Sequence, residues 1–169
     1  MRRIITAITM LALATATASA VSAQGVRFGA GLTGLFGIGS NNSGSAFGGT
    51  GLVEFGGRID HPLGFRVDGS VVHGSGVTSE LATGDVVYNF HTPERLLHPY
   101  LLAGGGIQHS PGFTKPMAKG GAGFEYHMFH RNRGTVLFGE ATFNLLFRGN
   151  GAGTGKALQA NLGLKFGGH

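Results

Sequence analysis

The chain has 169 residues, a length that suits one domain, and its 13 Lys and Arg residues outnumber 8 Asp and Glu residues for a formal charge of +5. The basic residues are scattered singly and do not alternate with aromatic side chains, which argues against nucleic acid as a partner. The sequence contains no cysteine, which excludes disulfides and a lipid-modified cysteine. The 33 glycines follow no collagen period and lie inside alternating segments, so we expect them to be features of a sheet.

Residues 1–23 have the pattern of a secretory signal peptide. Met1 to Arg3 is basic, Ile4 to Ala14 is apolar apart from its threonines, and Val21-Ser22-Ala23 fits the small-x-small rule for cleavage. The apolar run is shorter than the about 20 residues that a membrane-spanning helix needs, so an N-terminal anchor is less favoured. We expect cleavage after Ala23, with Ala20 as the alternative site, and a barrel domain over residues 24–169.

Apolar and polar residues then alternate in eight stretches of roughly ten residues each. The last stretch is the clearest, because Leu162 and Leu164 share one face while Lys165 lies on the other. The alternation predicts strands over residues 26–36, 47–57, 65–73, 78–90, 100–108, 117–128, 135–147 and 156–166. No helix or second sheet remains to cover the apolar face, so we expect lipid to cover it.

Eight antiparallel strands form the smallest transmembrane barrel, and a closed barrel has no exposed strand edge. The predicted fold class is therefore all-β, an eight-stranded antiparallel up-and-down transmembrane β-barrel preceded by a signal peptide. With both termini in the periplasm, the rings expected at the periplasmic interface are Phe28, Phe55, Phe65, Tyr88, Phe90, Phe124, Tyr126 and Phe166, and those at the other interface are Phe36, Phe47 and Phe147. A secreted soluble sandwich or lipocalin-like barrel is the alternative.

Four short motifs carry a resemblance to a known family: His98 to Gly106, Gly120 to Tyr126, Gly139 to Phe143, and Leu162 to Phe166. In these motifs the chain resembles the outer-membrane protein β-barrel domain family, which is related to the transmembrane domain of outer-membrane protein A and to the opacity-type proteins. The resemblance spans the mature chain, although family members usually end on the aromatic residue and Gly167-Gly168-His169 follow Phe166 here.

The resemblance implies a location in the bacterial cell outer membrane. It also implies outer-membrane lipid and lipopolysaccharide as partners, together with the barrel-insertion machinery during assembly. We expect a monomer.

Eight charged side chains are expected on the inward face near the periplasmic end: Arg27, Glu54, Arg66, Asp68, Asp85, Glu125, Glu140 and Lys165. Strand pairing predicts Glu54 opposite Arg66 or Asp68. It also predicts that Glu140 lies near two others of the set, Glu125 and Lys165. Because an unpaired buried charge costs several kcal/mol, we expect these groups to pair and fill the lumen.

A mostly filled lumen favours a structural envelope component without catalytic activity. The first alternative is a small-solute pore whose selectivity the charges set, since many inward glycines could widen the path. The second is surface adhesion, although the predicted exterior loops are short: Gly37 to Ala46, Gly74 to Val77, His109 to Pro116 and Arg148 to Gly155.

Three patterns that invite other functions are not supported. Gly151 to Lys156 resembles a phosphate-binding loop but lacks its first glycine, its final hydroxyl residue and a following helix. A lipid A hydrolase built on His73, Ser75 and Glu140 is the least favoured alternative, because Glu140 is expected to point inward near the opposite end. His127 and His130 have a spacing seen in metal sites but lie at a turn. We predict no catalytic residue, cofactor or metal.

Overall fold

The computed structural model describes residues 25–38, 44–58, 61–90, 96–127, 134–147 and 154–167. The predicted signal peptide and its cleavage site lie outside these residues. The strands are β1 (Val26–Ile38), β2 (Ser45–Arg58), β3 (His61–Gly74), β4 (Val77–Asn89), β5 (Leu97–Ser110), β6 (Phe113–Tyr126), β7 (Thr135–Phe147) and β8 (Thr154–Phe166). Within the described ranges no helix is long and apolar enough to cross a membrane.

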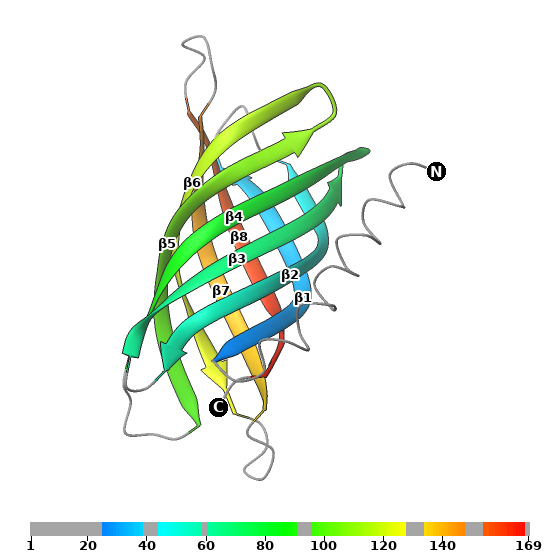
Figure 1. Ribbon diagram of the computed structural model, residues 1–169. Coiled ribbons are helices and arrows are strands. Elements are labelled where there is room, and N and C mark those ends of the chain that lie inside the picture. The colour runs from blue at the N-terminus through cyan, green and yellow to red at the C-terminus, as the bar shows by residue number, and fades with distance from the viewer. Residues whose placement is uncertain are drawn as a thin grey trace.

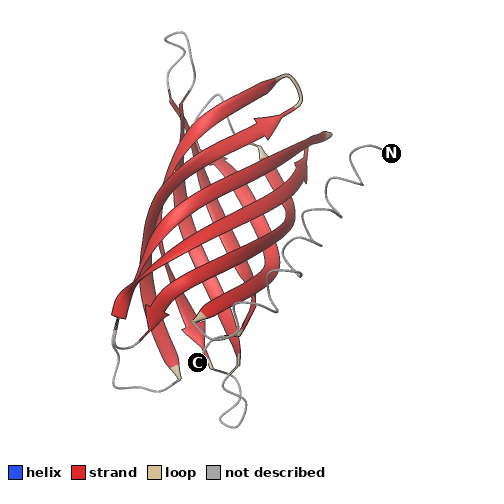
Figure 2. Ribbon diagram, viewed as in Figure 1, coloured by secondary structure: helices blue, strands red, loops and turns tan. Residues whose placement is uncertain are grey.

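The eight strands form one closed antiparallel barrel in which each strand pairs with its neighbours in sequence and β1 pairs with β8 (Figures 1 and 2). This confirms the predicted all-β up-and-down barrel. We call the end where β1 begins at Val26 and β8 finishes at Phe166 the terminal end, and the end where β1 finishes at Ile38 the far end. Closure pairs every strand on both sides and removes the edges that would otherwise need covering.

The described hairpins at the far end are tighter than the sequence predicts. Ser75 and Gly76 both have positive φ, 51° and 75°, which is the two-residue turn whose twist matches that of a hairpin. Between β5 and β6, Pro111 presets the first turn position and Gly112 takes the positive φ of 89° at the second. The loop predicted over His109 to Pro116 is therefore wrong, because the strands run on to Ser110 and restart at Phe113.

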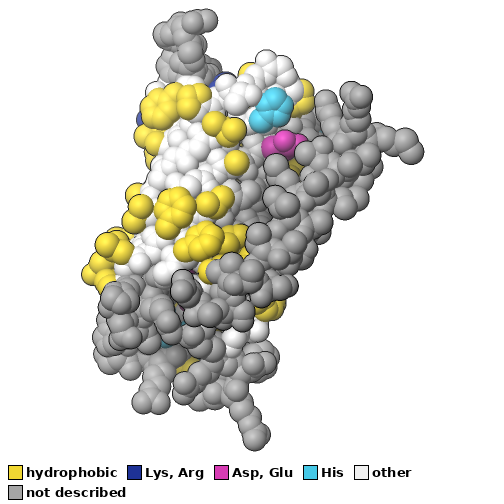
Figure 3. All heavy atoms as spheres, viewed as in Figure 1, with side chains coloured by type: hydrophobic (Ala, Val, Ile, Leu, Met, Phe, Trp, Pro, Cys, Tyr) yellow, Lys and Arg dark blue, Asp and Glu magenta, His cyan; other side chains and the backbone are white. Residues whose placement is uncertain are grey.

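The alternation places most apolar side chains on the outside and most polar ones inside. The outward residues include Leu32, Phe65, Val86, Leu101 and Leu162, all of which are exposed. Figure 3 shows such hydrophobic side chains spread over the outer surface. Aromatic rings lie near both strand ends, and the rings of Phe36 and Phe47 meet edge to face at 5.6 Å at the far end. The molecule has the inside-out polarity of a barrel in lipid.

Candidate functional site

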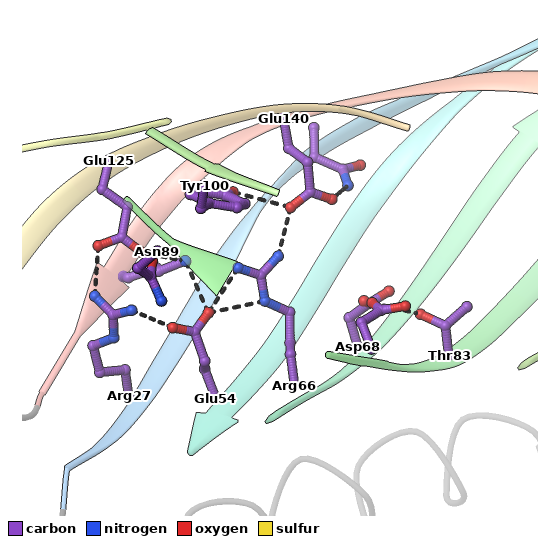
Figure 4. Close-up of polar contacts among 12 residues, drawn as sticks. Arg27, Glu54, Arg66, Asp68, Thr83, Asn89, Tyr100, Glu125 and Glu140 are labelled. Carbon is purple, nitrogen blue, oxygen red and sulfur yellow. Dashed lines mark hydrogen bonds and ion pairs between the residues drawn. The ribbon is translucent and has the colours of Figure 1, made fainter. Parts of the chain in front are cut away.

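The candidate site is the interior of the barrel. All eight charged residues predicted for the lumen point inward, and the structure divides them into two groups. Six of them form a terminal cluster of three cations and three carboxylates: Arg27, Arg66, Lys165, Glu54, Glu125 and Glu140. Asp68 and Asp85 lie apart from it; Figure 4 shows Asp68 to one side of the group around Glu54.

Glu54 is the centre of the terminal cluster. Its carboxylate accepts hydrogen bonds from Arg27, from Nε and Nη2 of Arg66 at 2.9 and 2.7 Å, and from Lys165 at 3.1 Å (Figure 4). Glu54 and Arg66 are Cα partners on β2 and β3, as strand pairing predicts. Three cations contact the single carboxylate of Glu54, which leaves a net positive charge. The other two carboxylates of the cluster neutralise it.

Glu125 and Glu140 complete the balance from the opposite wall. Glu125 accepts from Arg27 at 2.5 Å and from Lys165 at 2.6 Å. Glu140 accepts from Nη1 of Arg66 and from the hydroxyl of Tyr100 at 3.0 Å. The sequence predicts that Glu140 lies with Glu125 and Lys165, but Glu140 forms no ion pair with Lys165. Its ion pair is with Arg66 instead, because Arg66 on β3 reaches across the lumen to β7.

Two aromatic rings pack against the cluster. Tyr100 and Phe138 are fully buried, and Lys165 Nζ lies 4.9 Å from the centroid of the first ring and 5.4 Å from that of the second. The inward glycines make room for these rings: a Cβ at Gly123 would lie 2.4 Å from Cζ of Tyr100, its cross-strand partner. A Cβ at Gly163 would lie 2.8 Å from Phe138. At these two positions the absence of a Cβ leaves space for a bulky ring inside the lumen.

The second group is a triad around Lys119, a residue that the predicted set omits. Its ammonium lies 2.7 Å from Asp68 and 2.7 Å from Asp85, and it donates to Thr83 at 3.0 Å. The group holds one cation for two carboxylates, and Oδ1 of Asp85 is buried without a hydrogen-bond partner in the described part of the chain. The sequence signal that could have found Lys119 is its inward place in the alternation of residues 117–128.

Uncharged polar side chains continue the network from the terminal cluster toward the far end. Asn161 donates to Glu140 at 3.1 Å, Gln159 donates to Asn161 at 3.2 Å, and Asn144 donates to Gln159 at 3.0 Å. Beyond this chain lies an apolar layer, which consists of Val72, Leu81, Met117 and Leu146 with Leu35 and Ala46 packed against them. Charges and rings lie in the lumen near the terminal end, and an apolar layer lies in it near the far end.

Among the described residues, those considered for catalysis or metal binding do not come together. His73 lies on the outer surface, where its Nδ1 is 3.0 Å from Thr78 Oγ1, whereas Glu140 lies in the lumen. Of the histidine pair with metal-site spacing, His127 stacks edge to face on His98 at 5.0 Å, and His130 lies outside the described residues.

Of the comparisons with known proteins, the one with solved structures supports the fold. No family model matches the chain, and no curated protein matches it significantly. Among solved structures, neisserial surface protein A (NspA) matches with a TM-score of 0.70 at 16% identity, over 83% of this chain and 96% of that one. The N-terminal β-barrel domain of Pseudomonas aeruginosa OprF matches at 0.56 and 18%, over 85% and 98%.

A third structure, Ail, the attachment invasion locus protein of Yersinia pestis, matches with a TM-score of 0.50 at 13% identity, over 85% of this chain and 96% of that one. These neighbours are eight-stranded outer-membrane barrels, which confirms the resemblance at the level of the fold. The chain therefore has the architecture of the small outer-membrane β-barrels.

Proposed function

We propose that the chain is an integral protein of the bacterial outer membrane and serves there as a closed, structural component of the envelope. The observation that carries the proposal is the inverted polarity of the barrel. The charged members of its fully buried side chains are Arg66, Lys165, Glu54 and Asp85, while leucine, valine and phenylalanine side chains stand exposed on the outside. In water such an outer surface would have to be covered, whereas lipid covers it at no cost.

The length of the strands fits this setting. Each strand has 13 or 14 residues. At about 3.3 Å per residue and a tilt of about 45°, such a strand spans roughly 30 Å, which is the thickness of the hydrocarbon core of a bilayer. The partners that follow are outer-membrane lipid and lipopolysaccharide, with the barrel-insertion machinery acting during assembly of a monomer.

Cell fractionation combined with thiol labelling tests the location and orientation. Because the natural chain contains no cysteine, Ser75→Cys at the far end or Asn89→Cys at the terminal end introduces a single reactive thiol. We expect both variants in the outer-membrane fraction. A membrane-impermeant maleimide should label the Ser75→Cys variant in intact cells and the Asn89→Cys variant only after permeabilisation. The reverse labelling would overturn the orientation, and recovery in the soluble periplasmic fraction would overturn the location.

The structural role is tested separately by deleting the gene. We expect deletion to increase uptake of a hydrophobic fluorescent dye through the outer membrane, and we expect the intact chain to reverse it. Unchanged dye uptake in the deletion strain would contradict an envelope role.

A narrow pore is the second candidate function. The observation that favours it is a set of buried polar atoms without protein partners in the described ranges: Oδ1 of Asp85, Oγ1 of Thr142 and Oδ1 of Asn144. All three face the lumen between the terminal cluster and the apolar layer, and such groups are commonly satisfied by water. A water-filled stretch would still end at the apolar layer, so we favour the closed barrel.

Adhesion and catalysis are less favoured. The name of Ail refers to attachment, but the far-end turns after β3 and β5 in this chain have two residues each and offer little contact surface.

We propose that the protein is not an enzyme, because His73 and Glu140 face opposite sides of the barrel wall and a general base must reach its nucleophile.

A further inference from the structure

A cavity opens at the far end of the barrel, above the apolar layer. Its volume is about 240 Å³, and inward residues of all eight strands line it. The floor consists of Leu35, Ala46, Leu146 and Ala157. Leu35, Ala46 and Leu146 also belong to the apolar layer, so the far-end cavity is a cup whose floor is that layer.

One wall of this far-end cavity is polar. Gln108 on β5 and Lys115 on β6 are Cα partners, and both line the cavity. Oε1 of Gln108 is buried and has no hydrogen-bond partner among the described residues. A buried polar atom left in this state costs free energy that a bound group could recover.

Lys115 supplies the positive charge of the cavity. Its Nζ lies 4.0 Å from the centroid of the Phe113 ring, and within the described part of the chain no carboxylate forms an ion pair with it. This contrasts with the lumen cations Arg27, Arg66 and Lys119, each of which contacts two carboxylates. The far-end cavity therefore combines an apolar floor with a cation that has a ring, but no carboxylate of the described residues, beside it.

We propose that the far-end cavity binds a medium-chain fatty acid, with its carboxylate at Lys115 and its hydrocarbon tail on the apolar floor. The ammonium donates to one carboxylate oxygen. The amide of Gln108 can turn its Nε2 toward the other oxygen, because the two orientations of an amide differ only by a half-turn. The proposal goes beyond the envelope role and does not depend on it, since the cup belongs to the barrel itself.

The volume sets the expected length of the tail. If each carbon takes about the 30 Å³ of a water molecule, the cavity holds roughly eight carbons. Octanoate is therefore the matching probe. Each methylene added up to that length should tighten binding about fourfold, and further methylenes should add little because they leave the cup.

Equilibrium dialysis of radiolabelled octanoate against the full barrel in phosphatidylcholine nanodiscs tests the proposal, with protein-free nanodiscs measuring uptake by the bilayer. Lys115→Gln removes the cation, and Ala157→Leu fills the floor of the cup. Lys156→Gln is the matched control, because it removes a lysine from the outward-facing side of β8 near the same end. Far-UV circular dichroism checks that each variant is folded.

We expect one saturable octanoate site per chain, an affinity at least tenfold weaker in Lys115→Gln, no saturable site in Ala157→Leu and an unchanged site in Lys156→Gln. Octanol, which lacks the charge, should bind the natural chain and Lys115→Gln equally weakly. Uptake that matches protein-free nanodiscs would overturn the proposal. Equal octanoate affinity in the natural chain and Lys115→Gln would overturn the assignment of the carboxylate to Lys115, whatever the behaviour of the floor variant.

Discussion

Glu54 and Arg66 face each other across β2 and β3 and form a two-point contact in the lumen, in which Nε and Nη2 of the guanidinium both donate to Oε2 of the carboxylate. The two side chains are 0% and 1% exposed. Neither charge can return to water without unfolding, so each depends on its partners. This dependence makes the terminal cluster the part of the molecule where single substitutions have the clearest consequences.

Glu54→Gln should destabilise the barrel strongly. The substitution keeps the shape of the side chain but leaves Arg27, Arg66 and Lys165 without their shared carboxylate, and breaking a buried ion pair costs about 3–5 kcal/mol. The measurement is the free energy of unfolding in denaturant from lipid vesicles, followed by far-UV circular dichroism. Glu80→Gln is the matched control, because Glu80 is exposed and should change stability by less than about 0.5 kcal/mol. Equal effects of the two substitutions would contradict the structure of the cluster.

Lys119→Met should destabilise the barrel because it leaves Asp68 and Asp85 buried together without their cation. Adding Asp68→Asn and Asp85→Asn to Lys119→Met should restore most of the lost stability, since the buried negative charge disappears. A double-mutant cycle measures this coupling, which we expect to reach about 1–3 kcal/mol. Additive losses would show that Lys119 does not interact with the two carboxylates.

Inward and outward glycines should respond oppositely to alanine. A Cβ at Gly123 would lie 2.4 Å from the Tyr100 ring, so Gly123→Ala should cost about 1–3 kcal/mol through overpacking. At Gly69 on the outer face, the nearest atom to a Cβ would be 3.8 Å away, and the φ is not positive. Gly69→Ala should therefore be neutral or stabilise by up to about 1 kcal/mol. Comparable destabilisation by both substitutions would contradict the proposed seating of Tyr100.

The alternation of side chains made the fold predictable, because a period of two assigns every residue of a strand to one face. Even in residues 100–108, where most side chains are apolar, a period of two places Tyr100 and Leu102 on the opposite face from Leu101, and the structure buries the first two and exposes the third. The loop predicted over His109 to Pro116 is wrong because its two prolines, Pro111 and Pro116, do not break the strands for that length. Pro111 instead takes the first position of a two-residue turn, and Pro116 lies in β6 opposite Ile107.

The pairing of charges could not be predicted in the same way. Neighbouring strands fix partners such as Glu54 and Arg66, but Arg66 also reaches Glu140 on β7, four strands away along the sheet. Such contacts depend on the diameter of the barrel and on how far long side chains extend across it. Lys119 was placed inward by the alternation, yet its bonds to Asp68 cross the lumen in the same way.

Electrical recording in planar lipid bilayers tests the closed lumen most directly. The natural chain is inserted at single-molecule density, and insertion is checked independently by reconstituting the same preparation and following its folded state by circular dichroism. Tyr100→Ala combined with Phe138→Ala removes the two rings that fill the terminal cluster and serves as the opened comparison. We predict no steady conductance from the natural chain, because ion pairs, rings and the apolar layer block the lumen in series. Steady conductance steps from the natural chain would contradict the closed barrel and establish the pore.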